Sequence, residues 1–263
     1  MRSMAILYPK RLALAAVLLL PAPMTIAQSA PERPCEEQVF EETKFIVCTA
    51  TPGRDDLRLF WKDRAGEPYR RFPAIAESVA GEGRTLAFAI NAGMYLTDFS
   101  PIGLYVEEGR ELRPASTKTM DGPSQKIPNF YKKPNGIFYL NGGDAGIVPT
   151  DDYLKHRPTA RFATQSGPML VIKNKLNPIF LAGSRDRTRR SGVGVCEGGL
   201  VRFAISEGAV NFHDFARLFR DRLRCRDALF LDGGNGAGIY EPHLGRSDMS
   251  WHGGYGPVFG LVE

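Results

Sequence analysis

Polar residues follow short apolar segments at several points of the chain, each time beside glycine. In the stretch ALFLDGGNGAGIY, an apolar run ends at Asp232 and glycine then fills four of the next six positions. Strand ends that meet glycine turns often display functional side chains, although Asn, Asp and Gly are also ordinary turn residues. The positions of this kind are Asn91-Ala92-Gly93, Asn135-Gly136, Gln165-Ser166-Gly167-Pro168, Arg189-Arg190-Ser191-Gly192 and Asp232-Gly233-Gly234.

The glycine-rich stretch does not match the familiar ligand-binding loops. Its spacing is G-x-G-x-G rather than G-x-G-x-x-G, and Pro242 leaves no room for the helix that would hold a pyrophosphate. No P-loop lysine follows, and Gly234 stands where an EF-hand needs an oxygen ligand. A GxSxG elbow is absent, so an esterase centred on Ser166 is only a distant alternative. No ligand spacing establishes a metal site, and we expect neither a metal nor a cofactor.

The start of the chain has the features of a secretory signal peptide. Basic residues at Arg2, Lys10 and Arg11 precede the apolar run LALAAVLLL, which is too short to span a bilayer. The residues TIA that follow end with the small side chains that signal peptidase recognises. We expect a signal peptide over 1–27, a leader over 28–39 and a single domain over 40–263, located in the periplasm or secreted. Retention as an uncleaved anchor is the less favoured alternative.

Charge and cysteine content limit the partners and the compartment. The full chain carries a formal charge of +5, and removal of the signal leaves about +2, which gives no argument for a nucleic-acid partner. No second long apolar segment is present, so we expect no transmembrane segment in the mature chain. An even number of cysteines in an exported chain favours disulfides. Of the three possible pairings we favour Cys35–Cys48 and Cys196–Cys225, because each pair lies near the edges of neighbouring elements.

The apolar periodicity indicates more strands than helices. Alternating or buried apolar runs predict strands, several of them in hairpins, over 44–50, 57–61, 85–90, 136–140, 169–173, 192–196, 200–206 and 227–231. Short helices are expected over 73–79 and 151–156, the latter capped by Thr150. A clearer helix begins after Asn211 as its N-cap, with apolar residues at i, i+3, i+4 and i+7. Regular βαβ alternation is missing, which predicts a single α+β domain with a mixed, largely antiparallel sheet.

Six segments in order resemble the phosphodiester glycosidase family, to which the mannose-6-phosphate uncovering enzyme belongs. They are FAINAGMY, PIGLYVEEG, NFYKKPNGIFY, ATQSGPMLV, RSGVGV and ALFLDGG, and the resemblance runs from about Phe88 to the C-terminus. The best-known member removes N-acetylglucosamine from a sugar-1-phosphate diester. The resemblance implies an α+β fold and a hydrolase that acts on a glycosyl–phosphate linkage of envelope or extracellular glycans, with a carbohydrate or sugar-phosphate as its substrate.

This chemistry needs a carboxylate beside the sugar C1, donors for the phosphate, and amides or hydroxyls for the sugar. Asp232 is the best carboxylate, followed by Asp98 and Glu207. Arg190 is the best phosphate ligand, and with Asn91 it completes the predicted catalytic set. The N–H groups of Gly233 and Gly234 are candidates for an anion nest. The predicted substrate-binding residues are Gly93, Asn135, Gln165, Ser166, Gly233, Gly234 and Asn235.

The chain also departs from the pattern of its relatives. Relatives usually carry a serine within a few residues of the aspartate, whereas this chain reads Asn235-Gly236-Ala237-Gly238, and Ser191 stands where Asn is common. Asn235 either replaces the lost hydrogen bond or marks a changed substrate or weakened activity. A non-catalytic glycan- or polymer-binding module on the same fold is therefore the alternative function.

Overall fold

The computed structural model describes residues 1, 4, 33–123 and 126–263. The predicted signal peptide, apart from two isolated positions, lies outside the described residues. Arg33–Glu263 forms one compact unit. No helix among the described residues is long and apolar enough to cross a membrane.

Three antiparallel sheets make up this unit, and within the described residues every strand pairing in them is antiparallel. The first, seven-stranded sheet has the order β1 (Cys35–Phe40), β2 (Thr43–Ala50), β13 (Val201–Ser206), β12 (Arg190–Cys196), β14 (Cys225–Gly233), β10 (Met169–Ile172) and β11 (Lys175–Leu176). The second has the order β16 (Arg246–Ser247), β15 (Ile239–Glu241), β4 (Leu86–Asn91), β17 (Val258–Val262) and β3 (Asp56–Phe60). The third has the order β6 (Arg110–Arg113), β5 (Tyr105–Glu107), β9 (Phe162–Ser166), β7 (Gly136–Asn141) and β8 (Asp144–Pro149).

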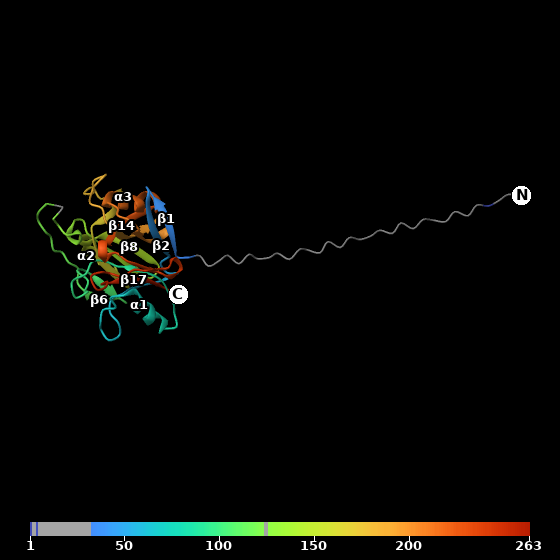
Figure 1. Cartoon of the computed structure of the whole chain (residues 1–263), viewed down its shortest axis with the longest axis horizontal. Helices are drawn as coiled ribbons and strands as arrows, with labels where there is room; N and C mark the ends of the chain where they lie inside the picture. The colour runs from blue at the N-terminus through green and yellow to red at the C-terminus, as the bar shows by residue number, and fades with distance from the viewer. Residues whose placement is uncertain (2–3, 5–32, 124–125) are drawn as a thin grey trace. The chain divides into compact units, whose positions relative to one another are not determined.

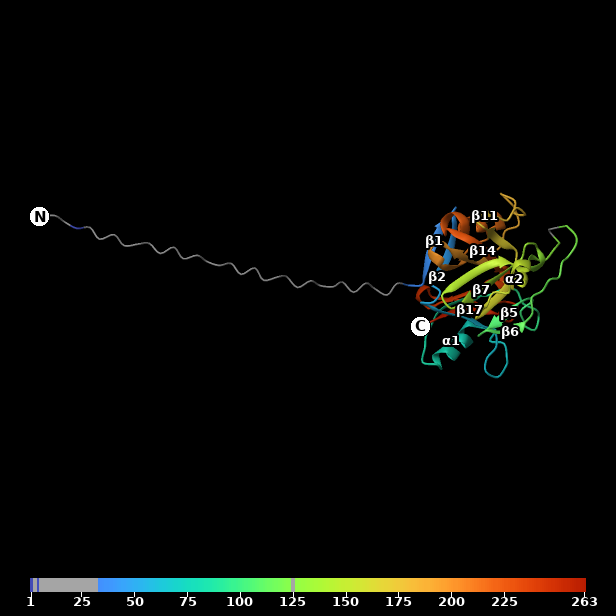
Figure 2. The same ribbon diagram turned by 180° about the vertical axis from the view of Figure 1, so that it is seen from behind.

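Short helices cover the outer faces of these sheets. α1 (Phe72–Ala80) and α3 (Phe212–Arg217) lie at opposite ends of the unit in Figure 1, and Figure 2 shows β14, β7 and β17 between those ends. The third helix is α2 (Thr150–His156), and single 3-10 turns span Asn129–Tyr131, Glu197–Gly199, Gly234–Gly236 and Pro242–Leu244. The predicted α+β fold with a largely antiparallel sheet in one domain is confirmed.

An aromatic triad joins the three sheets in the central core. Phe203 of the first sheet, Phe259 of the second and Phe138 of the third are all fully buried. The ring centroid of Phe259 lies 5.3 Å from that of Phe203 and 5.2 Å from that of Phe138. Such pairs contribute about 0.5–1.5 kcal/mol each beyond the area they bury. The triad therefore packs the three sheets against one another in the core.

The helix predicted after Asn211 forms, with one refinement. Asn211 caps it as expected, because its side chain accepts the Asp214 N–H at 2.8 Å. The helix then widens into a π-helical turn over Leu218–Arg222.

The expected cap of α2 at Thr150 is wrong, because Thr150 is itself the first helical residue and its hydroxyl accepts the Gln165 amide at 3.1 Å.

Both favoured disulfides are present. Cys35 is paired with Cys48, and Cys196 with Cys225. The first of these bonds lies within the β1–β2 ladder, where the two cysteines face each other. The segment 28–39, expected to be a leader, therefore divides: 28–32 lie outside the described residues, whereas Cys35–Phe40 is an edge strand tied to the first sheet.

Candidate active site

The candidate site is assembled from strand ends of all three sheets. β4 ends at Asn91, β9 ends at Ser166, and Asp232 is the penultimate residue of β14. The Ser166 hydroxyl donates to the Leu231 carbonyl at 2.9 Å, which fastens β9 to β14 one residue before Asp232. A Cβ built on Gly93 would lie 3.7 Å from that of Ser166, so the chain after β4 also passes here. Asn91, Gly93, Ser166 and Asp232 are therefore neighbours in the fold.

Asp232 is the carboxylate that this arrangement presents. It is partly exposed, and its Oδ1 accepts the Gly233 N–H at 2.7 Å. The Ser191 hydroxyl holds its main chain by donating to the Asp232 carbonyl at 3.1 Å and accepting the Asp232 N–H at 3.2 Å. Burial raises the pKa of the Asp232 carboxyl to about 7, against the opposing Gly233 hydrogen bond. A carboxyl that titrates near neutral pH is a candidate for catalysis.

Gly236 is the residue that leaves room for this carboxylate. A Cβ at Gly236 would lie 2.2 Å from Oδ2 of Asp232, closer than any real contact. The turn Gly234–Gly236 produces this approach, and Gly234 has a φ of +58°, which favours glycine. Gly234 and Gly236 thus allow the turn to place the Asp232 side chain.

The anion nest expected at Gly233 and Gly234 is not formed. The Gly233 N–H donates to the Asp232 carboxylate, and the Gly234 N–H donates to the Arg189 carbonyl at 2.9 Å. Both donors are used within the turn itself, because β14 continues its ladder with β12 up to Gly233. These two glycines therefore shape the turn rather than supply donors to an anion.

Two buried polar atoms behind the turn have no hydrogen-bond partner among the described residues. Asn91 accepts the Gly238 N–H through Oδ1 at 3.1 Å, but its Nδ2 is unpartnered. The Tyr255 hydroxyl is also unpartnered and packs on Gly238, where a Cβ would lie 2.1 Å from it. A buried unsatisfied group costs about 1–3 kcal/mol. Both side chains are almost fully buried, so they belong to the packing behind the turn rather than to a surface that a ligand contacts.

The rim of the site contains residues that sequence reasoning missed. The Tyr95 hydroxyl donates to the Gly254 carbonyl at 2.8 Å. The pKa of Tyr95 is raised by burial and by the charge of Asp232, against a hydrogen bond with Ser250. Asn235 is exposed, and its Nδ2 lies 3.4 Å from Nε2 of His252. The only signal for Tyr95 was its position at the end of FAINAGMY.

Arg190 does not point its guanidinium at Asp232. It is almost fully buried, donating from Nε to the Val210 carbonyl at 2.9 Å and from Nη2 to the Asp186 carbonyl at 3.1 Å. Its guanidinium carbon stacks 3.7 Å from the centroid of the Phe212 ring. Burial lowers its pKa to about 10, although Asp186 opposes the shift. Contrary to its assignment as the phosphate ligand, Arg190 ties the start of β12 to the segment before α3.

A surface cavity of about 470 Å³ lies against the residues that hold Arg190. Asp186 and Phe212 line it, together with Lys126, Lys132 and His213. The Lys132 ammonium is 5.6 Å from the Phe212 ring centroid, and burial lowers its pKa. This cavity is a cationic and aromatic surface separate from the Asp232 turn.

The contacts of Arg190 predict that its replacement affects stability. Arg190→Ala removes a buried donor from the Val210 and Asp186 carbonyls, although the Val210 carbonyl keeps the Thr188 N–H at 3.3 Å. We expect a loss of about 1–3 kcal/mol in the free energy of unfolding. Arg226→Ala, at a largely exposed arginine, is the matched control and should change it by less than about 0.5 kcal/mol. Urea unfolding measures both. An unchanged stability with lost activity would instead assign Arg190 to the substrate.

Gln165 and Asn135 have their polar groups engaged within the protein. Gln165 accepts the Leu104 and Ser116 N–H groups and donates to the Ser116 carbonyl and Thr150. Asn135 donates to the Phe130 carbonyl at 3.1 Å and accepts from Lys133 at 3.2 Å. Both are almost fully buried. Neither is free to bind a sugar, so the structure gives them roles in holding loops, contrary to expectation.

The remaining candidates are also bound locally. Ser166 is fully buried and donates to a carbonyl, so it lacks the free hydroxyl that an esterase nucleophile needs. Asp98 is exposed and caps its own turn through Ser100, whose hydroxyl lowers its pKa. Among the described residues, no group of three or more His, Cys, Asp or Glu side chains could hold a metal ion.

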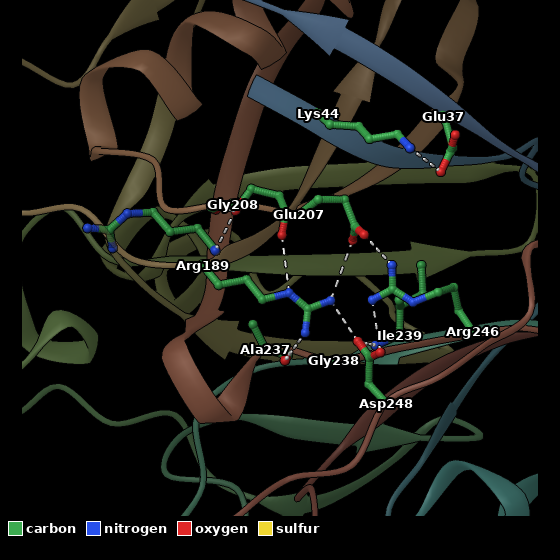
Figure 3. A network of polar contacts seen from close by, with 12 residues as sticks. Glu37, Lys44, Arg189, Glu207, Gly208, Ala237, Gly238, Ile239, Arg246 and Asp248 are labelled. Atoms are coloured by element: carbon green, nitrogen blue, oxygen red, sulfur yellow. Dashed lines mark hydrogen bonds and ion pairs between the residues drawn. The ribbon is translucent and has the colours of Figure 1, made fainter. Parts of the chain in front are cut away.

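Glu207 belongs to an ion network drawn in Figure 3. It pairs with Arg246 and lies 3.8 Å from Arg189, while both arginines also bind Asp248, at 2.6 Å from Arg189 and 2.9 Å from Arg246. Arg189 further donates to the Ala237 carbonyl at 3.3 Å. The network thus braces the turn after Asp232 against the loop that begins at Asp248.

Comparisons with known proteins identify relatives of this chain. The sequence profile of the phosphodiester glycosidase family matches residues 84–252. The uncharacterized protein YigE of Escherichia coli (strain K12) is 31% identical over 185 residues, which covers 70% of this chain and 70% of that protein.

Two solved structures share the fold. The catalytic domain of zebrafish N-acetylglucosamine-1-phosphodiester alpha-N-acetylglucosaminidase, auto-inhibited by its pro-peptide, gives a TM-score of 0.59 at 15% identity, covering 86% of this chain and 81% of that one. A hypothetical protein from Synechocystis gives a TM-score of 0.53 at 14% identity, covering 87% of this chain and 61% of that one. At these identities the likeness concerns the fold alone.

Proposed function

The chain belongs to the phosphodiester glycosidase family, and on this premise we propose that it is an exported hydrolase that cleaves a sugar-1-phosphodiester linkage. The observation that carries the proposal is Asp232, a carboxylate with a raised pKa at the point where the ends of three sheets meet. Its substrate is a carbohydrate joined through phosphate, of the kind present in envelope or extracellular glycans.

In the proposed reaction the bond between C1 and the phosphate oxygen breaks, and its electron pair leaves with the phosphate ester. Positive charge then develops at C1, and an ionised Asp232 beside it stabilises this charge. Water adds to C1 and loses a proton, giving a free sugar and a phosphomonoester. Because a phosphate ester is already a weak base, this reaction depends less on a strong general acid than ordinary glycoside hydrolysis does.

The neighbours of Asp232 have positioning functions in this proposal. Ser191 and Ser166 hold the backbone of β14 on either side of the peptide bond before Asp232. Asn91 is fully buried and holds the turn by accepting the Gly238 N–H through its Oδ1. Asn235, exposed beside His252, stands where relatives carry a serine and supplies the polar contact at that position. Arg190 acts at a distance by holding the residues around Phe212.

Export is supported by two observations that are independent of the site. Both cysteine pairs are disulfide-bonded, and such bonds persist in oxidising compartments such as the periplasm or the extracellular space. The first 27 residues of the sequence have the pattern of a signal peptide. We propose a periplasmic or secreted location on these grounds.

Hydrolysis in H₂¹⁸O tests the reaction and its bond cleavage together. We expect the protein to convert methyl phosphodiesters of hexose 1-phosphates into a sugar and methyl phosphate, with the label in the sugar. Label in the phosphate would show attack at phosphorus and contradict the proposal.

The alternative, a non-catalytic glycan-binding module, is favoured by one observation, the missing hydroxyl near Asp232. Binding of the same compounds without turnover, unchanged in Asp232→Asn, would support this alternative. Turnover that depends on Asp232 would exclude it.

A further inference from the structure

An exposed tryptophan lies on a turn at the edge of the candidate site. Trp251 is 87% exposed, in contrast to most large aromatic side chains of the unit, which are buried in its core. The turn is closed by the Gly253 N–H, which donates to the Ser250 carbonyl at 3.2 Å, and by the His252 N–H, which donates to the Ser250 hydroxyl at 3.2 Å. Trp251 occupies a central position of this turn.

Both sequence neighbours of Trp251 contact the rim of the site. Ser250 interacts with Tyr95, whose pKa also responds to the charge of Asp232. His252 lies beside Asn235, three residues after Asp232. The exposed indole of Trp251 therefore lies between Ser250 and His252, both of which contact the rim around Asp232.

The turn is held firmly at both of its ends. Before it, Asp248 forms ion pairs with Arg189 and Arg246, as Figure 3 shows. After it, the Gly254 carbonyl accepts the Tyr95 hydroxyl, and the Tyr255 N–H donates to the Arg70 carbonyl at 2.8 Å. Anchors of this kind hold the backbone of the turn in place, so that little backbone conformational entropy is lost when a ligand binds there.

We propose that Trp251 is a specificity-determining residue that stacks on a pyranose ring of the bound substrate. The apolar C–H face of a pyranose matches the flat, electron-rich face of an indole, while the sugar hydroxyls stay in solvent or reach polar neighbours such as His252. Large rigid aromatic residues supply much of the binding energy at recognition sites. The inference rests on the proposed function, because it assigns the sugar part of the same substrate to this turn.

Fluorescence can isolate Trp251, because the chain has two tryptophans. The other, Trp61, is buried, and its indole Nε1 has no hydrogen-bond partner among the described residues. Trp61→Phe therefore removes no hydrogen bond and leaves Trp251 as the sole indole. We expect titration of this variant with methyl phosphodiesters of hexose 1-phosphates to shift or quench its emission. Unchanged emission across the series would overturn the proposal.

Kinetics separate this role from a structural one. Trp251→Ala should raise KM roughly tenfold with kcat within about twofold, and Trp251→Phe should recover most of the loss. Met249→Ala, two residues away and similarly exposed, should leave both constants unchanged. An equal KM in wild type and Trp251→Ala would contradict the proposal. If the Trp251 emission changes on titration but no compound is hydrolysed, the stacking role is supported and the proposed reaction is wrong.

Discussion

Asp232→Asn should lower kcat for sugar-1-phosphodiester hydrolysis by about 10²- to 10⁴-fold. The amide keeps the size of the side chain but cannot carry the negative charge that stabilises positive charge at C1. KM should change much less, because Asp232 contributes mainly in the transition state. Steady-state kinetics with the purified variant measure both constants, and equal rates would remove Asp232 from the mechanism.

The same variant should be more stable than wild type at alkaline pH. This result would show that its loss of activity is not caused by misfolding. The pKa of Asp232 is about 7 in the folded protein, against the ordinary value of 3.8. The folded state therefore binds the proton more tightly, and wild-type stability falls as pH rises between these values. Full burial would make the cost about 4 kcal/mol, and because Asp232 is partly exposed we expect about 1–2 kcal/mol at pH 8. At pH 4 wild type should lose this disadvantage.

Gly236→Ala should lower kcat by about 10²-fold, since misplacing a reacting group by about 1 Å has effects of this size. The new Cβ would overlap Oδ2 of Asp232, so the carboxylate must rotate away from its place over the turn. The backbone needs no rearrangement, because φ at Gly236 is not positive. We therefore expect a folded protein with a displaced carboxylate, measured by kcat together with the melting temperature.

Gly143→Ala is the matched control for that change. A Cβ at Gly143 meets nothing within 4 Å, and its φ is also not positive. Its kcat should equal that of wild type. A fully active Gly236→Ala protein would mean that the carboxylate of Asp232 need not lie over this turn.

Much of the fold could be predicted from local pattern. The apolar runs that became β4, β7 and β14, and the periodicity that became α3, identified these elements correctly. Their pairing was not predictable in the same way, because β4 and β14 pair with strands that are not their neighbours in the sequence. The last strand of the sequence, β17, was missed although it lies between β4 and β3 in the second sheet. Gly260 interrupts its apolar run, and the structure explains why. Its Cβ position is already occupied by Leu86 and Phe60 of the flanking strands.

The candidate site was predictable only as a set of strand ends. Asn91, Ser166 and Asp232 carry turn-forming neighbours in the sequence, and the three sheets bring them together. Gln165 and Arg190 have the same local signature but are committed to protein partners. These hydrogen bonds are made to residues in distant segments, such as Ser116 and Val210, so a short-range sequence pattern cannot reveal them. Tyr95, Ser250 and His252 were missed for the same reason.

The pH dependence of kcat/KM, compared between wild type and Asp232→Asn from pH 5 to 9, decides whether an ionised Asp232 takes part in the reaction. If an ionised Asp232 acts at the reacting carbon, wild-type activity should rise as pH increases through about 7 and then level off, as its pKa requires. The residual activity of Asp232→Asn should lack this inflection. A profile that falls through pH 7, or an inflection that survives in the variant, would contradict the account.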